Sequence, residues 1–123
     1  MANMYVRGIT KETSNKLVTV KFLRLWISTD QQKKPVSIEA ILMDSEGSKI
    51  PAYVKRGLLS NFKRQMIEGE TVNIANFGCR GQQPEKMNQG QDPMPVKLIF
   101  NYITKVIKNN WMHNKNMQHR LCR

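Results

Sequence analysis

The side chains of this sequence that could do chemistry are mainly cations and aromatic rings. Lysine and arginine outnumber aspartate and glutamate by 20 to 9, which gives a formal net charge of +11. Cationic side chains pair with phosphate or carboxylate groups, and a neighbouring aromatic ring can stack on a planar base. The candidates are Arg24, Trp26, Lys33, Lys34, Lys49, Tyr53, Lys55, Arg56, Arg80, Lys97 and Lys105. Their combined charge predicts a polyanionic partner, and nucleic acid is the first hypothesis.

The two aromatic candidates differ in how firmly the pattern places them. Ile50, Ala52 and Val54 alternate toward one side of an expected strand, which turns Tyr53 outward and favours stacking over mere cover for a neighbour. Trp26 ends another expected strand. It either takes a base on its indole face or caps one end of the core, and both interpretations stay open.

Catalytic and metal-binding patterns are missing from the sequence. There is no phosphate-cradling Gly-Lys-Ser motif and no nucleophile beside a base, so we expect no enzyme activity, no cofactor and no small-molecule substrate. His113, His119 and Cys122 lie in a polar tail, and we expect no metal there. Glu68 and Glu70 flank an expected cap glycine and are interpreted as turn residues.

Length and composition place the chain among single globular domains. The 123 residues allow one hydrophobic core, and 40% of them are apolar. No apolar run approaches the roughly 20 residues that span a bilayer, so we expect no membrane partner. Cys79 and Cys122 lie 43 positions apart, which does not indicate a disulfide framework. We therefore expect an intracellular, reducing location.

The candidate residues need a scaffold, and the period of the apolar residues predicts one. Alternation of apolar and polar residues predicts strands over 17–26, 36–43, 50–54, 70–77 and 96–106. The phase of the first strand slips at Leu23, which predicts a bulge or strong bend. After Arg56 the period changes to that of a helix, with Leu58, Leu59, Phe62, Met66 and Ile67 on one stripe. Gly69 is placed to end this helix in the left-handed conformation.

The remaining segments are interpreted as connections. Asp44 to Ser48 supplies a tight reversal between the second and third strands, and 28–35 is a polar loop that carries Lys33 and Lys34. Residues 80–95 form a long loop that is either functional or disordered. We expect a flexible lead-in over 1–15, a folded domain over 16–107 and a basic, disordered tail over 108–123.

The order of these elements predicts the fold class. Three strands, one helix and two strands form an all-β protein with one helix between strands three and four. This is the connectivity of the five-stranded OB-fold, a Greek-key barrel. Such barrels bind oligonucleotides on the outer face of strands two and three, flanked by the first and last loops.

A string of local motifs adds a family resemblance over residues 16–106. The motifs are Val-Lys-Phe-Leu-Arg-Leu-Trp (20–26), Ser-Ile-Glu-Ala-Ile-Leu-Met-Asp-Ser-Glu-Gly-Ser-Lys-Ile (37–50), Glu-Gly-Glu (68–70), Asn-Phe-Gly (76–78), Lys-Leu-Ile-Phe (97–100) and Thr-Lys-Val (104–106). In this order they resemble the first OB domain of the plant-type proteins similar to the replication protein A large subunit. The resemblance implies a nuclear protein that binds single-stranded DNA with low sequence preference in replication, repair or recombination, together with other replication protein A-like subunits.

The sequence departs from that family in two respects. Ile38 and Lys55 align with the positions where stacking aromatics are expected on strands two and three. The later domains and the cysteine-rich zinc ribbon of full-length large subunits do not follow, so we expect a truncated relative with weaker binding. Three alternatives stay open: an OB module that binds acidic peptides of a protein partner, a single-stranded RNA-binding domain, and a remnant that binds nothing specifically.

Overall fold

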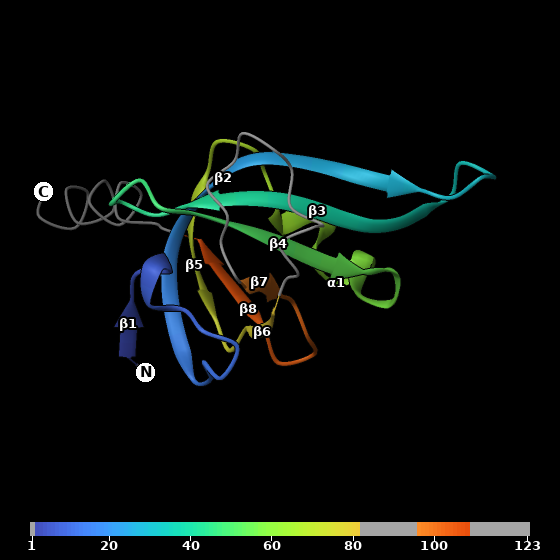
Figure 1. Cartoon of the computed structure of the whole chain (residues 1–123). Helices are drawn as coiled ribbons and strands as arrows, with labels where there is room; N and C mark the ends of the chain where they lie inside the picture. The colour runs from blue at the N-terminus through green and yellow to red at the C-terminus, as the bar shows by residue number, and fades with distance from the viewer. Residues whose placement is uncertain (1, 82–95, 109–123) are drawn as a thin grey trace, which may run out of the picture.

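The computed structural model describes residues 2–81 and 96–108, in which β-strands predominate (Figure 1). The strands are β1 (Ala2–Met4), β2 (Lys16–Thr29), β3 (Pro35–Met43), β4 (Lys49–Lys55), β5 (Thr71–Ala75), β6 (Gly78–Gly81), β7 (Val96–Ile99) and β8 (Lys105–Lys108). A single-turn α-helix, α1 (Leu59–Phe62), lies between the 3-10 turns η2 (Arg56–Leu58) and η3 (Lys63–Gln65), and η1 (Val6–Gly8) follows β1. No helix in these two stretches is long and apolar enough to cross a membrane.

The long strand β2 bends and joins two parts of the sheet. Its first half pairs with β5, from Leu17 opposite Ala75 to Lys21 opposite Thr71, and its second half pairs with β3. The register shifts between Phe22 and Arg24, so the predicted irregularity at Leu23 is confirmed. Because a bulge bends its strand and increases the local twist, β2 can belong to both sides of a curled sheet.

The strand order is β6-β7-β4-β3-β2-β5-β8, with β1 beside β2. Strand β7 runs parallel to β4, while β8 runs antiparallel to β5. Strands β7 and β8 lie near opposite edges of the sheet, yet only residues 100–104 connect them. The sheet must therefore curl into a half-barrel that brings its two edges close together. The mostly-β prediction with one short helix is confirmed. The strand count differs from the predicted five, because a turn at 101–104 divides the last predicted strand and β1 and β6 are added.

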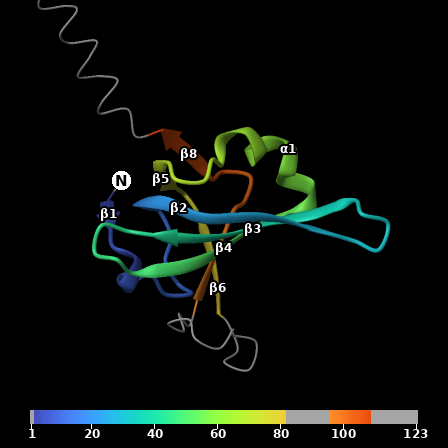
Figure 2. The same cartoon turned by 90° about the horizontal axis from the view of Figure 1, so that it is seen from above.

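Alternate residues of the sheet form the core. Strand β3 buries Ile38, Ala40 and Leu42, and the alternation of β4 buries the predicted Ile50, Ala52 and Val54. The helical segment covers this core with Leu58 and Phe62, and Met66, directly after it, is buried as well (Figure 2). The ring of Phe62 meets that of Phe100 edge to face, with centroids 4.9 Å apart.

The helical segment ends earlier than the sequence predicted. It stops at Gln65, so Ile67 is not on the buried stripe and is 46% exposed. Gly69 has the predicted left-handed conformation, with φ of 91°, but it belongs to the turn before β5. Its N–H donates to the carbonyl of Phe22, and the carboxylate of Glu68 accepts the N–H of Leu25. This turn therefore supports the bend of β2.

Residues 2–15 are not the loose lead-in that their mixed composition predicted. Strand β1 pairs in parallel with the start of β2, and Val6 and Ile9 are buried in the core. The N–H of Val6 donates to the carboxylate of Asp44 over 2.8 Å. Val6 and Ile9 follow no period in the sequence, but their burial in the core holds this segment against the sheet.

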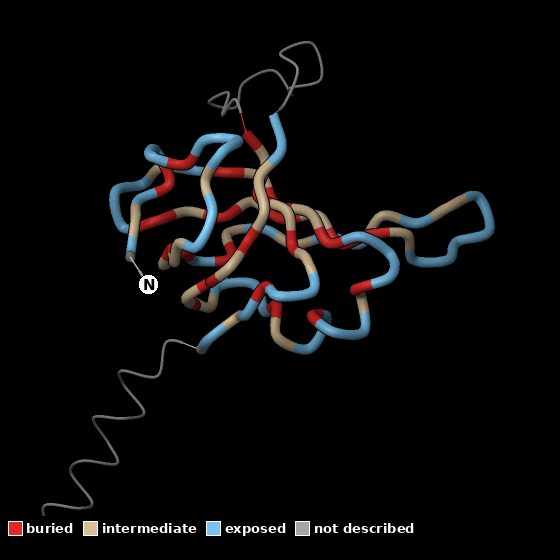
Figure 3. The backbone as a smooth tube through the Cα atoms, turned by 90° about the horizontal axis from the view of Figure 1, so that it is seen from below, coloured by how far each residue is buried: buried red, intermediate tan, exposed pale blue. Residues whose placement is uncertain are grey.

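The far end of the β2–β3 hairpin projects from the rest of the molecule (Figures 1 and 2). Buried backbone gathers in the centre, whereas this end is largely exposed (Figure 3). Arg80 and Gly81, expected in the long loop, belong to β6, and Lys108, expected in the tail, belongs to β8. The rest of both segments, including His113, His119 and Cys122, lies outside the described residues.

Candidate nucleic-acid interface

The outer face of β2, β3, β4 and β7 carries most of the candidate side chains. The register places Trp26 opposite Glu39, Glu39 opposite Tyr53, and Tyr53 opposite Ile99. Residues opposite one another in a sheet share a face, so both aromatic candidates belong to one row across the strands. The next row toward the β2–β3 loop contains Ser28, Ser37 and Lys55. These two rows, the adjoining row of Arg24, Ile41 and Pro51, and Lys97 on β7 are together called the outer face.

A network of three polar residues lies at the centre of the outer face. The ammonium of Lys97 is 5.3 Å from the centroid of the Tyr53 ring and 3.1 Å from a carboxylate oxygen of Glu39. The other carboxylate oxygen of Glu39 accepts the hydroxyl of Ser37 over 2.9 Å. The sequence pattern turned Glu39 away from the core, but only the pairing register reveals that its carboxylate lies between the two aromatic candidates.

Trp26 lies on this surface and does not cap the core. Its side chain is 43% exposed, and the guanidinium of Arg24 lies 5.7 Å from the ring centroid. Arg24 is opposite Ile41 on the same outer face. A cation above an aromatic ring at this distance is attracted by the ring's quadrupole. Trp26 therefore repeats the arrangement of Tyr53, an aromatic ring beside a cation.

Trp26 also borders an apolar hollow of about 280 Å³ next to the helical segment. Its other lining residues are Leu25, Ile27, Ile38, Lys63 and Met66. Lys63 is the one charged side chain among them.

The β2–β3 loop is held by one carboxylate. A single oxygen of Asp30 accepts the backbone N–H groups of Gln32 and Lys34 over 2.8 and 2.9 Å. Its other oxygen lies 3.4 Å from the guanidinium of Arg56. The N–H of Lys34, followed by that of Gln32 and by Arg56, lowers the pKa of Asp30 below its ordinary value. The loop thus presents Lys33 and Lys34 from a defined conformation.

Three of the remaining candidate cations lie on β4 or β6, at or near the outer face, and the fourth, Lys105, lies elsewhere. Lys55 lies on the outer face at one end of β4, Lys49 lies at its other end opposite Met43, and Arg80 lies opposite Lys97. Lys49, Lys55 and Arg80 are exposed, whereas Lys97 is half-buried. Lys105 is on β8, beyond β5, so the structure does not bring it to the outer face. The prediction that Lys105 belongs to the same site is not supported by the strand order.

The two positions that were aligned with expected stacking aromatics differ in the side of the sheet that they face. Ile38, placed at the stacking position of strand two, is 4% exposed and lies in the core opposite Ile27. The residue that faces outward there is Glu39. Lys55, aligned with the other stacking position, does point to the outer face. The strand-two position of this interface is therefore acidic.

Sequence reasoning also missed Tyr102. It was expected within a continuous strand over 96–106, but it lies at the tip of the turn between β7 and β8 and is 80% exposed. The ammonium of Lys55 is 5.2 Å from its ring centroid. No periodic pattern identifies such a residue, because the turn that exposes it interrupts the alternation.

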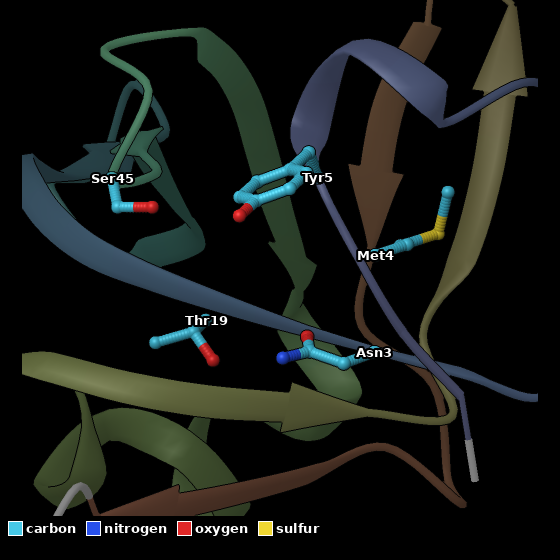
Figure 4. A pocket seen from close by; sticks show the side chains of 5 residues that line it. All are labelled: Asn3, Met4, Tyr5, Thr19 and Ser45. Atoms are coloured by element: carbon cyan, nitrogen blue, oxygen red, sulfur yellow. The ribbon is translucent and has the colours of Figure 1, made fainter.

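A second hollow, of about 460 Å³, lies away from these residues, at the start of β2 (Figure 4). Asn3, Met4, Tyr5, Thr19 and Ser45 line it. None of these side chains is charged, so this hollow does not have the chemistry that binds a polyanion.

Comparison with known structures defines the fold class. The chain is similar to a replication protein A heterotrimer bound to single-stranded DNA, with a TM-score of 0.66 and 11% identity over 85% of this chain and 24% of that one. It is similar to the OB domain of Ta0387 from Thermoplasma acidophilum, with a TM-score of 0.61 and 12% identity over 89% of each chain. It is also similar to Pot1pC of Schizosaccharomyces pombe bound to single-stranded DNA, with a TM-score of 0.62 and 10% identity over 98% of this chain and 99% of that one. These likenesses show an OB-fold.

Sequence comparison gives the family. Residues 9–121 match the family described as the domain of unknown function DUF223, and the chain belongs to it. No curated protein matches the sequence. The chain spans about a quarter of the length of the replication protein A chain to which it is similar.

Proposed function

We propose that this chain binds single-stranded nucleic acid, foremost single-stranded DNA, with low sequence specificity. One observation carries the proposal: Trp26 and Tyr53 share a row of the outer face, and each ring has a cation between 5 and 6 Å from its centroid. Two proteins with similar folds are bound to single-stranded DNA in their structures, which supports this choice of ligand.

The mechanism follows from the chemistry of the outer face. Bases stack on Trp26 and Tyr53, and this is indifferent to sequence because every base has a π-face. Arg24, Lys55 and the loop lysines neutralise phosphates and release condensed counterions. Stacking and phosphate pairing use groups that every nucleotide has, and we therefore propose low sequence specificity.

The cellular role is a finer part of the same proposal. The motifs over 16–106 favour a relative of the plant-type replication protein A large-subunit-like proteins, acting in the nucleus in replication, repair or recombination. We propose binding without catalysis. Burial raises the pKa of the Cys79 thiol to about 11, which makes this residue a poor nucleophile.

Titration at several salt concentrations tests the electrostatic part. If three to five phosphates are neutralised, log K should fall with log salt with a slope of about −2 to −3.5. Fluorescence anisotropy with short DNA, RNA and duplex ligands measures both this slope and the ligand preference. A flat salt dependence would remove the electrostatic claim, and tighter binding of RNA would select the RNA alternative.

Two variants test stacking. Trp26→Ala and Tyr53→Ala should each weaken binding of an oligothymidine about fivefold to a hundredfold, because a stacked base contributes about 1–3 kcal/mol. Tyr5→Ala is the matched control, since Tyr5 is an exposed aromatic residue that lines the other hollow. Circular dichroism should be unchanged in all three variants. Unchanged affinity in both test variants would leave binding to the charges alone.

The apolar hollow beside Trp26 favours a second candidate function, the binding of an acidic amphipathic peptide from a protein partner. Apolar side chains of the peptide would enter the hollow, and a carboxylate would pair with Lys63. Competition separates the two functions. The displacement of a fluorescent oligothymidine is measured with an acidic peptide and with unlabelled single-stranded DNA. Equally effective displacement by the peptide would favour the protein partner.

A further inference from the structure

We propose that the turn at 101–104 carries a third base-binding position besides Trp26 and Tyr53, formed by the ring of Tyr102 and the ammonium of Lys55. This inference rests on the proposed function and extends it beyond the outer face to a residue that no sequence pattern or comparison assigns.

The turn holds Tyr102 in a fixed place. Asn101 N–H donates to the hydroxyl of Thr104 over 2.8 Å, and Thr104 N–H donates to the carbonyl of Asn101 over 3.2 Å. The side-chain oxygen of Asn101 accepts the N–H of Ile103 over 2.9 Å. The Thr104 hydroxyl also contacts the carbonyl of Asn76 over 3.1 Å, which anchors the turn to the end of β5. Because the backbone of the turn is already fixed, binding at Tyr102 does not have to order the loop.

The position of the turn continues the outer face. Tyr53 and Lys55 point the same way from β4, two residues and therefore about 7 Å apart. The N–H of Phe100 donates to the carbonyl of Tyr53, so the chain leaving β7 passes along the end of β4 into the turn. A strand that stacks one base on Tyr53 and runs toward Lys55 reaches Tyr102 next.

The local chemistry fits one nucleotide. The free face of the Tyr102 ring can stack on a base. The ammonium of Lys55, which lies 5.2 Å from the ring centroid, can pair with the adjoining phosphate. The neighbouring Arg56 is engaged by Asp30 and supports the same end of β4. The ligand is thus the next base and phosphate of a strand already bound at Trp26 and Tyr53.

The test uses the full chain and oligothymidines of about four and about twelve nucleotides. Tyr102→Ala should weaken both ligands about fivefold to a hundredfold, because about four nucleotides already reach from Trp26 past Tyr53 to Tyr102. Tyr102→Phe should bind as the unaltered protein does, because it keeps the ring. Ile103→Ala is the matched control, since Ile103 is 63% exposed on the same turn but offers no stacking surface.

The failures are distinguishable. Equal binding of the longer ligand by Tyr102→Ala and the unaltered protein overturns this inference and leaves the proposed function standing. Equal losses in Tyr102→Ala and Ile103→Ala overturn it as well, because they indicate a general effect of the turn. If the unaltered protein binds neither ligand, the proposed function fails and the inference fails with it.

Photochemical cross-linking gives an independent readout. A longer oligonucleotide that contains iodouracil should attach to the tryptic peptide 98–105, in which Tyr102 is the exposed aromatic residue and Phe100 is buried. The adduct should disappear in Tyr102→Ala. An adduct that persists in this variant, or one found only on other peptides, contradicts the assignment.

Discussion

At the scale of single residues, the acidic group in the middle of the outer face is the main difference from a plain basic groove. Glu39 holds Lys97 over the ring of Tyr53 and accepts a hydrogen bond from Ser37. A phosphate that approaches Tyr53 must compete with this carboxylate for the same ammonium. We therefore expect Glu39 to weaken phosphate binding at this face, while its contacts order the side chains around Tyr53.

Glu39→Gln should consequently strengthen binding of an oligothymidine several-fold. The substitution removes a negative charge from the face and leaves Lys97 available, which should steepen the salt slope by about 0.7 for one additional phosphate contact. Anisotropy titrations at two ionic strengths measure both effects. Glu46→Gln is the control, because Glu46 pairs with Arg7 and not with a residue of the outer face. Unchanged or weaker binding by Glu39→Gln alone would argue against competition for Lys97.

At the scale of elements, the β2–β3 loop depends on the ionised form of Asp30. Its carboxylate accepts two backbone N–H groups and meets Arg56, and these contacts lower its pKa from the ordinary 3.8. A carboxyl whose pKa is lowered by folding stabilises the folded form at pH values above its unfolded pKa, and this effect is lost as the pH falls through the folded pKa. The loop should therefore stay ordered at neutral pH and loosen only in acid.

Nuclear magnetic resonance can follow this step. The amide signals of Gln32 and Lys34 should shift together in a titration with a midpoint below 3.8, while the amide of the buried Val72 should not shift in the same step. In Asp30→Ala both loop amides should exchange with solvent faster at neutral pH, because their acceptor is gone. A midpoint at or above 3.8 would be inconsistent with the contacts described for Asp30.

At the scale of the whole molecule, one buried carboxylate joins the N-terminal segment to the sheet. Asp44, at the end of β3, accepts the N–H of Val6 over 2.8 Å and those of Glu46 and Ser48 over 3.0 Å each. It is 5% exposed. The same residue therefore shapes the β3–β4 turn and closes the core over Val6.

Asp44→Ala should lower the free energy of unfolding by about 3 kcal/mol, because three hydrogen bonds to a charged group are lost and the buried N–H of Val6 stays unpaired. Urea denaturation measures the change. Ser45→Ala, in the same turn at an exposed position, should change stability by less than about 0.5 kcal/mol. Similar unfolding curves for the two variants would mean that Asp44 does not join the two segments.

Local patterns in the sequence were enough to predict the mostly-β fold class, the bend of β2 and the alternation of β3 and β4. These features depend on near neighbours, since the period of the apolar residues decides which face each strand buries. The outward direction of Tyr53 and Lys55 could be predicted for the same reason. The sequence also determined the positive charge that motivates a polyanionic ligand.

Only the tertiary structure decided which outward residues meet. The register placed Glu39 between Trp26 and Tyr53, and the strand order separated Lys105 from the other cations. It also buried Val6 beneath the β3–β4 turn and exposed Tyr102 beside Lys55. These relations join residues far apart in the chain, and a pattern of period two gives the face of a residue but not its partner on the next strand.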